Sequence, residues 1–333
     1  MSDPTLEAKL FSDNSLPIVN VSGLLSPAIA DRKDVGKELQ DACLNYGFFY
    51  ITGHSVSSEL RASVFERAQE FFALPTSVKE KINLANSSCN RGYEPLRGQT
   101  LEPGQPPDLK EGFYSGSEIP EDDQRVKDGK FNHGPNQWPD VVPEFKTVMA
   151  EYHLTMLKLG KLMMRGLALS LDLTETYFDG FCVDEVATLR ILHYPPQPPN
   201  PISGEKGCGA HTDFGTITLL MQDDCGGLQV WIEEKGWVHV NPMPNTYVAN
   251  LGDMMARWTN ARYRSTRHRV INTSGRERYS VPFFYMGNPD FPVKCIPTCL
   301  KAGQLAKYQE TTVEKHYQEM YRATYAPGII NGF

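Results

Sequence analysis

The sequence predicts an α+β fold: a jelly-roll core (a double-stranded β-helix) with flanking helices. Two observations indicate this fold. Between residues 186 and 285 the chain consists of short apolar stretches separated by turns, a pattern typical of β-sandwiches and barrels. Stretches with apolar residues at helical spacing, over 29–46, 57–73 and 144–171, lie before that region. Helices are therefore expected to pack on the outside of a β core.

The composition excludes several classes of protein. The chain has 333 residues, of which 40% are apolar and 22% charged, and this excludes a disordered, collagenous or coiled-coil protein. A net charge of −7 disfavours nucleic acid and anionic membranes as partners. No apolar run approaches the roughly 18–20 residues of a membrane helix, and residues 1–15 lack the blocks of a secretory signal. The seven scattered cysteines suit free thiols in a reducing compartment. We therefore expect a cytoplasmic protein, and our expectation for its oligomeric state is a monomer.

The N-terminal region, residues 1–143, is expected to begin with a strand over 16–21, helix 29–46, strand 48–51 and helix 57–73. Residues 86–143 differ, because they are rich in Gly, Pro, Asn and Asp with isolated aromatic residues. This segment is too long for an ordinary loop. We therefore expect it to cross the surface or to cover a site on the substrate side.

The second region, residues 144–333, is expected to form one compact unit with the first. It begins with a helix over 144–171 whose apolar stripe predicts that it backs a sheet. A final helix is expected over 305–321. Between the two helices the pattern predicts strands over 186–193, 216–221, 228–232, 237–240, 247–251, 267–271 and 278–284.

Three residues of the β region have the character of metal ligands. His211 and Asp213 are two apart, so in a strand both point to one face. His268 follows 55 residues beyond Asp213, at the start of another predicted strand. Two imidazoles and one carboxylate leave the opposite side of a metal open, which suits Fe(II) that binds a co-substrate and oxygen. By itself the His-x-Asp pair has an alternative interpretation as two polar strand residues.

A second pair of residues strengthens the metal-site interpretation. Arg278 and Ser280 lie ten and twelve residues after His268, and in a strand they share a face. A guanidinium beside a hydroxyl suits a carboxylate, because Arg binds it in a bidentate manner and Ser adds one hydrogen bond. An Arg inside a barrel also needs an anion, since an unpaired buried charge is costly.

These motifs resemble those of a known family. The segments HTDFGTITLL, GDMMARWTNARYRSTRHRVIN and RYSVPFF, together with LPIVNVSGLL and GFFYITGH near the start, resemble the Fe(II)/2-oxoglutarate-dependent dioxygenases of the isopenicillin N synthase-like group. The resemblance covers about residues 16 to 325. It implies that the metal ligands are His211, Asp213 and His268, and that 2-oxoglutarate contacts Arg278, Ser280 and Tyr194. Many relatives have Asn two residues before this Tyr, whereas this chain has Leu192, so a second polar contact to the co-substrate is in doubt.

The resemblance also implies an activity. We expect O2- and 2-oxoglutarate-dependent C–H hydroxylation of a small ring-containing metabolite of secondary metabolism, giving succinate and CO2, with ascorbate as a reductant. One alternative is an Fe(II) oxidase of the same fold that performs desaturation or ring closure without 2-oxoglutarate. The C-terminal TYAPGIINGF lacks the Gln found near the end of isopenicillin N synthase, which counts against this oxidase. A non-catalytic binding protein is the other alternative, and the intact ligand and clamp residues argue against it.

Strand alternation singles out Arg190, which shares a face with Leu192 and Tyr194 and lies about 13 Å from Tyr194 at ~3.3 Å per residue. Two interpretations are open: a structural ion pair with an Asp or Glu elsewhere, or a hydrogen-bond donor to the substrate. Aromatic and Arg side chains offer flat faces and donors to a substrate, although each could simply pack in the fold. On this ground the further substrate candidates are Arg91, Tyr93, Tyr114, Phe214 and Trp258. No metal role is expected for the remaining histidines, His54, His133, His153, His193, His239 and His316.

Overall fold

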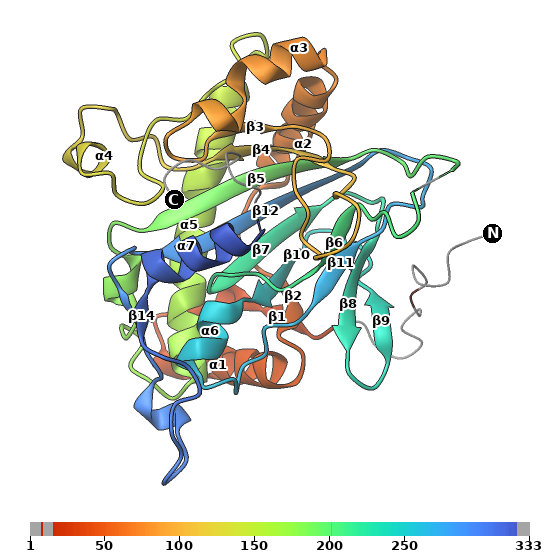
Figure 1. Cartoon of the computed structure of the whole chain (residues 1–333). Helices are drawn as coiled ribbons and strands as arrows, with labels where there is room; N and C mark the ends of the chain where they lie inside the picture. The colour runs from red at the N-terminus through yellow and green to blue at the C-terminus, as the bar shows by residue number, and fades with distance from the viewer. Residues whose placement is uncertain (1–7, 9–15, 201, 325–333) are drawn as a thin grey trace.

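Two β-sheets form the centre of the molecule in the computed structural model, which describes residues 8, 16–200 and 202–324 (Figure 1). Within these residues the larger sheet has eight strands, in the order β1 (Ile18–Asn20), β2 (Phe48–Thr52), β10 (Tyr247–Leu251), β7 (Ile217–Gln222), β12 (Arg278–Gly287), β5 (Val186–Tyr194), β4 (Glu111–Ser115) and β3 (Gly92–Glu94). The smaller sheet has the order β6 (Cys208–His211), β11 (His268–Val270), β8 (Leu228–Ile232) and β9 (Gly236–His239). This is the predicted jelly-roll core.

The strands of the larger sheet, apart from the edge strand β1, are largely buried on both faces, and each face has its own partner layer. On β5, Leu189 and Ile191 belong to the core under the helices. The alternate residues Arg190, Leu192 and Tyr194 line the cavity between the two sheets. The shared face predicted from alternation is therefore confirmed for these three residues, and the register of β5 is correct.

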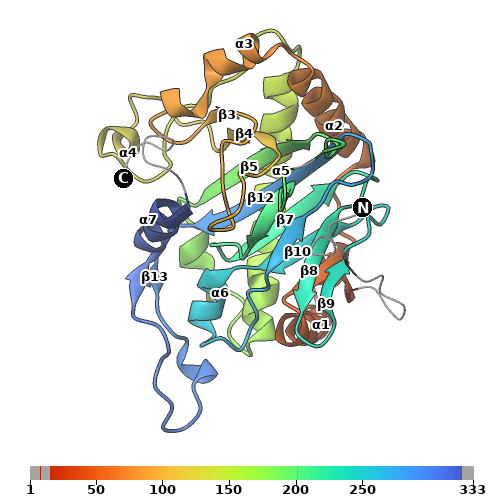
Figure 2. The same cartoon turned by 45° about the vertical axis from the view of Figure 1, so that its right-hand side comes forward.

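The helices cover the outer face of the larger sheet (Figure 2). These are α1 (Ile29–Asn45), α2 (Ser58–Phe72) and the long α5 (Phe145–Ser170), all within one or two residues of the predicted bounds. Methionines of α5 at positions 149, 156 and 163 are fully buried in the core. At Gly160 a Cβ atom would lie 2.5 Å from the ring of Tyr285, so glycine here lets α5 pack closely against β12.

The irregular segment, residues 86–143, contains more structure than its composition indicates. It includes β3 and β4, which extend the larger sheet beside β5, and the short helix α4 (Gln124–Lys127). Strands as short as these show no clear alternation among Gly and Pro residues. The loop that joins β3 to β4 lies in front of the sheet in both cartoons, as expected of a segment that covers a site (Figures 1 and 2).

Other elements correct the sequence-based expectation. The last helix, α7 (Val313–Thr324), begins eight residues later than the expected start at 305, because Thr311–Thr312 form strand β14 with β13 (Pro292–Val293). Strand β6 and helix α6 (Asp253–Trp258), which follows β10, were not expected. The short helix α3 (Thr76–Lys79) follows α2 after Pro75. The C-terminal segment without Gln, apart from Thr324, lies outside the described residues.

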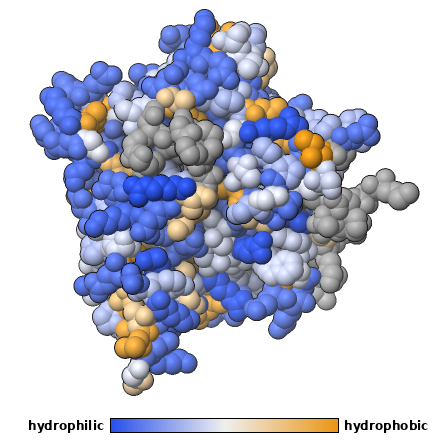
Figure 3. Space-filling model, in the orientation of Figure 1, coloured by the Kyte–Doolittle hydropathy of each residue, from blue (hydrophilic) through white to orange (hydrophobic). Residues whose placement is uncertain are grey.

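The surface and the chain organisation agree with the composition. The face in Figure 3 is mainly hydrophilic, with small and separate apolar patches. Among the described residues no helix is both long and apolar enough to cross a membrane. All seven cysteines are free. Strands from before and after residue 143 belong to one sheet, while the division of the chain at that residue stays a prediction.

Candidate active site

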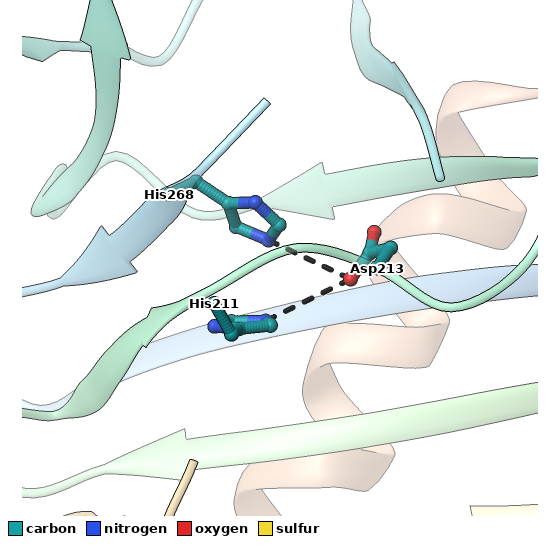
Figure 4. A group of neighbouring side chains, drawn as sticks. All are labelled: His211, Asp213 and His268. Atoms are coloured by element: carbon teal, nitrogen blue, oxygen red, sulfur yellow. Dashed lines mark ion pairs between the residues drawn. The ribbon is translucent and has the colours of Figure 1, made fainter. Parts of the chain in front are cut away.

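The three predicted metal ligands lie together (Figure 4), and all three line the cavity between the two sheets. His211 ends β6, His268 begins β11, and the two residues are directly paired in the smaller sheet. From Oδ1 of Asp213 the distance is 3.7 Å to Nε2 of His211 and 3.6 Å to Nε2 of His268. Asp213 lies beyond the end of β6, so the turn after the strand, rather than strand alternation, directs its carboxylate toward the histidines.

Backbone contacts from α6 fix this turn. The N–H of Asp253 donates to the carbonyl of Asp213 at 2.8 Å, and that of Met254 donates to Gly215 at 3.1 Å. At Gly252 a Cβ atom would lie 2.6 Å from the carbonyl oxygen of Asp213, so only glycine permits this approach. His316 on α7 adds a third contact, because its Nε2 donates to the carbonyl of Phe214 at 2.7 Å. The carboxylate is therefore positioned by two helices.

Hydrogen bonds hold each ligand with one atom directed at the other two. Nδ1 of His211 donates to the carbonyl of Gly209 at 2.8 Å, and Nδ1 of His268 donates to that of Thr266 at 3.1 Å. Oδ2 of Asp213 accepts from Thr218 and Asn250 at 2.5 and 2.6 Å. The opposite atoms, two Nε2 and one Oδ1, face one another, which is the arrangement of metal ligands with their supporting hydrogen bonds. The donor set fits Fe(II).

The electrostatics favour the protonation states that bind a cation. Burial acts to raise the pKa of Asp213, but His268, His211 and the hydrogen bonds from Asn250 and Thr218 outweigh it and hold this pKa below its ordinary value. Burial and the neighbouring His211 lower the pKa of His268. An ionised carboxylate and a neutral imidazole are the forms that ligate a metal.

A buried arginine lies in the cavity beside these ligands. Arg278 is fully buried, its Nη1 donates to Ser280 at 3.2 Å, and its Nε donates to the carbonyl of Gly226 at 2.5 Å. The guanidinium carbon lies 4.7 Å from the ring centre of Tyr194. Asp223 interacts with Arg278 electrostatically, but no carboxylate within the described ranges forms an ion pair with it. We name this part of the cavity the Arg278 compartment and define it by Arg278, Ser280, Tyr194 and the three ligands. It contains a cation that lacks an ion-pair partner among the described residues.

A second compartment adjoins the first. We name it the Tyr114 compartment, and the residues that it shares with the Arg278 compartment are Leu101, Arg190, His211, Asp213 and Phe284. Arg190 forms an ion pair with Glu94, donates to Oε1 of Gln99 at 3.1 Å and lies over the ring of Tyr114 at 4.5 Å. The ion-pair interpretation of Arg190 is therefore confirmed, and its place in the cavity wall keeps the substrate interpretation open as well. Most other lining residues are apolar or aromatic, namely Leu101, Tyr114, Phe214, Phe284, Met286, Tyr317 and Tyr321.

Three substrate candidates do not line either compartment. Arg91 is buried, and its guanidinium donates to the carbonyls of Cys89 and Asn132, so it ties the irregular segment together. The hydroxyl of Tyr93 donates to Glu111 at 2.6 Å on the helix-covered side of the sheet. Trp258 packs in the core and donates to the carbonyl of Pro292. These three side chains therefore stabilise the fold through packing and hydrogen bonds.

Some lining residues were missed. Phe284 shares the face of Arg278 and Ser280 on β12, so alternation could have identified it. Gln99 and Leu101 come from the loop after β3, where no periodic pattern exists. Tyr317 and Tyr321 are four apart on α7 and point to one face, but the sequence does not show that this helix reaches the cavity. The ligand group found among the described residues contains no other histidine, and most of the others bond to a carbonyl or carboxylate.

The hydrogen bonds to Asp213 lead to a first prediction. Thr218→Val and Asn250→Ala each remove one of the two bonds that orient its carboxylate, so the affinity for Fe(II) should fall about 10- to 100-fold. Competition with a coloured chelator measures this affinity. Thr259→Val is the matched control, because Thr259 is fully buried but bonds to Met255 in α6. An unchanged affinity in both site variants would show that these bonds do not support a ligand.

The jelly roll, the His-Asp-His ligands and the adjacent arginine define a non-haem iron oxygenase. Comparison with known families agrees: residues 186–287 match the 2OG-Fe(II) oxygenase superfamily, and residues 16–141 match the N-terminal model described as non-haem dioxygenase in morphine synthesis. The chain belongs to the 2OG-Fe(II) oxygenase superfamily. It is an enzyme that uses iron as cofactor and 2-oxoglutarate as co-substrate.

The similar proteins include several from fungi. The chain is 46% identical over 314 residues to the 2-oxoglutarate-Fe(II) type oxidoreductase hxnY of Emericella nidulans, covering 93% of this chain and 90% of the relative. It is 42% identical to the 2-oxoglutarate-dependent dioxygenase citB of Monascus ruber, covering 93% and 95%. Among solved structures, a full-length Neurospora crassa protein in complex with alpha-KG and thymine superposes with a TM-score of 0.80 at 29% identity, covering 95% and 99%.

Proposed function

We propose that the enzyme hydroxylates a C–H bond of a small ring-containing metabolite and releases succinate and CO2. The observation that carries this proposal is that two of the ligands, His211 and Asp213, line two adjoining compartments of different character. One contains the cation Arg278, which has no ion-pair partner among the residues that the structure describes, and the other is lined mainly by apolar and aromatic side chains. When bound at the three ligands, iron supplies the O2-dependent oxidation that is coupled to decarboxylation of 2-oxoglutarate.

In this proposal the Arg278 compartment holds the co-substrate. The guanidinium of Arg278 and the hydroxyl of Ser280 bind the distal carboxylate, which provides the anion that the buried cation lacks. Tyr194 forms the wall beside them, and Leu192 makes that wall apolar where many relatives place an amide. The role of these residues is to orient 2-oxoglutarate with its other end toward the ligands.

The Tyr114 compartment receives the substrate. Phe214, Phe284 and Tyr114 offer flat faces to a planar ring and exclude water from the site of oxidation. Arg190 and Gln99 form a polar corner of this wall, and they orient a polar edge of the ring. Succinate formed per substrate oxidised tests the proposal across a library of ring compounds. Oxidation without loss of 2-oxoglutarate would instead identify the oxidase alternative.

Two substitutions of Arg190 are expected to slow substrate oxidation to different degrees. Arg190→Lys keeps a cation beside Glu94 but loses the planar fork that stacks on Tyr114, so we expect at least tenfold slower substrate oxidation with normal thermal stability and normal binding of iron and 2-oxoglutarate. Arg190→Met removes the donors entirely, and we expect loss of substrate oxidation with some uncoupled succinate formation. Because it leaves Glu94 buried without its partner, it should also lower the free energy of unfolding by about 3–5 kcal/mol.

The two variants separate the two roles of Arg190. If Arg190→Lys oxidises substrate like the parent while Arg190→Met is only less stable, the residue is structural and the substrate role is wrong. The cytoplasm remains our proposed compartment, on the grounds of the scattered cysteines, and a monomer remains our proposed state.

A further inference from the structure

The two buried arginines of the cavity differ in their electrostatic environment. Arg278 has no carboxylate in an ion pair with it among the residues described, whereas Arg190 forms an ion pair with Glu94, which is 1% exposed at the end of β3. Glu94 also accepts a hydrogen bond from the hydroxyl of Tyr114 at 3.3 Å. The Arg278 compartment therefore contains a positive charge that is available to an anion. The polar corner of the Tyr114 compartment, formed by Arg190 and Gln99, does not.

A second buried ion pair lies near Arg190 and Glu94 and is also electrically neutral. Lys110 and Asp108 lie 2.7 Å apart with side-chain exposures of 1% and 2%, and the ammonium of Lys110 interacts electrostatically with both Glu94 and Arg190. These two cations and two anions sum to zero net charge. Glu94 itself lines neither compartment, but it pairs with Arg190, which does. An anionic group placed beside Arg190 in the Tyr114 compartment would therefore face a guanidinium whose charge is already balanced, with the negative charge of Glu94 close behind in an interior where like charges repel strongly.

The neighbouring amide completes the polar corner. Oε1 of Gln99 accepts from Arg190, and its NH2 group is the hydrogen-bond donor that this side chain can offer a ligand. An NH2 group is an uncharged donor, and its natural partner is an uncharged acceptor such as a carbonyl oxygen or a ring nitrogen.

We propose that Glu94 is a specificity-determining residue that masks the charge of Arg190, so that the enzyme accepts uncharged rings with a carbonyl or ring-nitrogen acceptor and rejects rings with a carboxylate. This inference rests on the proposed function, because it assigns the substrate to the Tyr114 compartment. It names the substrate class of that site.

The test uses matched ring pairs that differ only in charge: benzamide with benzoate, and indole-3-carboxamide with indole-3-carboxylate. Calorimetry measures their binding to the iron-loaded enzyme under anaerobic conditions, with 2-oxoglutarate at saturation so that no probe replaces it. We expect the parent enzyme to bind each carboxamide at least tenfold more tightly than its carboxylate. Glu94→Gln keeps an acceptor for Arg190 but removes the negative charge, so the carboxylates should gain at least tenfold in affinity and the carboxamides should change little.

Two controls isolate the charge of Glu94. Glu94→Asp keeps the charge and should continue to reject carboxylates, which separates charge from packing. Glu233→Gln removes an 85%-exposed charge on the surface and should change no affinity. The parent enzyme alone tests the proposal even if Glu94→Gln does not fold, since a parent that prefers carboxylates would overturn it. Equal selectivity in a folded Glu94→Gln variant would also overturn it.

A separate measurement distinguishes failure of the proposed function from failure of the inference about Glu94. Succinate formation is measured with the same probes and with a wider set of uncharged rings. Carboxamide-selective binding supports the specificity inference, whereas the absence of oxidation of every ring compound would contradict the proposed function. Oxidation of carboxylate-bearing rings by the parent, in preference to uncharged ones, would support the proposed function and overturn the role of Glu94.

Discussion

His211→Ala, Asp213→Ala and His268→Ala are each expected to abolish iron-dependent consumption of 2-oxoglutarate. The physical reason is that the three side chains offer one ligand atom each from within 4.8 Å of one another, and two remaining ligands hold Fe(II) poorly. Asp213→Glu should also bind iron weakly and turn over slowly, because the longer side chain moves the carboxylate away from Thr218 and Asn250. Iron content and succinate formation are the measurements.

A matched histidine separates this effect from a general loss of structure. His54 is half-buried and lines neither compartment, and its Nε2 bonds to the carbonyl of Asn245, so His54→Ala should keep both iron and activity. Circular dichroism checks that each variant is folded. Near-normal iron content and turnover in any one of the three ligand variants would show that the site is wrongly assigned.

Arg278→Gln is expected to weaken 2-oxoglutarate binding while iron binding stays nearly unchanged. The substitution removes the cation and the planar fork and roughly keeps the length. Because hydrogen bonds to charged groups are worth about 1.5–3 kcal/mol each, the apparent affinity should fall at least tenfold. Ser280→Ala removes only a hydroxyl and should have a smaller effect.

The neighbouring arginine supplies the control for charge. Arg276 is 59% exposed and lies two residues before Arg278, so Arg276→Gln changes the net charge equally without touching the cavity. Its affinity for 2-oxoglutarate should equal that of the parent. If Arg278→Gln had the same affinity as Arg276→Gln, the clamp would have to be assigned to another residue.

Local patterns in the sequence were sufficient for much of the fold and for the centre of the site. Helical spacing located α1, α2 and α5, and alternation placed Arg190, Leu192 and Tyr194 on the cavity face of β5. Alternation succeeds there because β5 is a long strand buried on both faces, where a slip of one residue would exchange the two faces. For Asp213 the predicted proximity to His211 is correct, although a turn produces it.

Features that depend on distant segments could not be predicted. Glu94 pairs with Arg190 across 96 residues, and no periodicity links the three-residue strand β3 to a strand so far away in the sequence. The same limit explains why Tyr317 and Tyr321 were missed, since they reach the cavity only through the docking of α7. Arg91 and Trp258 show the converse, because residue type alone does not distinguish a binding side chain from one that holds the fold together.

An anaerobic titration of the iron-loaded enzyme with 2-oxoglutarate tests the central claim most directly, because chelation of the co-substrate by Fe(II) gives a visible absorption band. We expect an equimolar titration in the parent, no band in Asp213→Ala, and the same band at a higher 2-oxoglutarate concentration in Arg278→Gln. A band that titrates identically in all three proteins would contradict the assignment of iron and 2-oxoglutarate to this cavity.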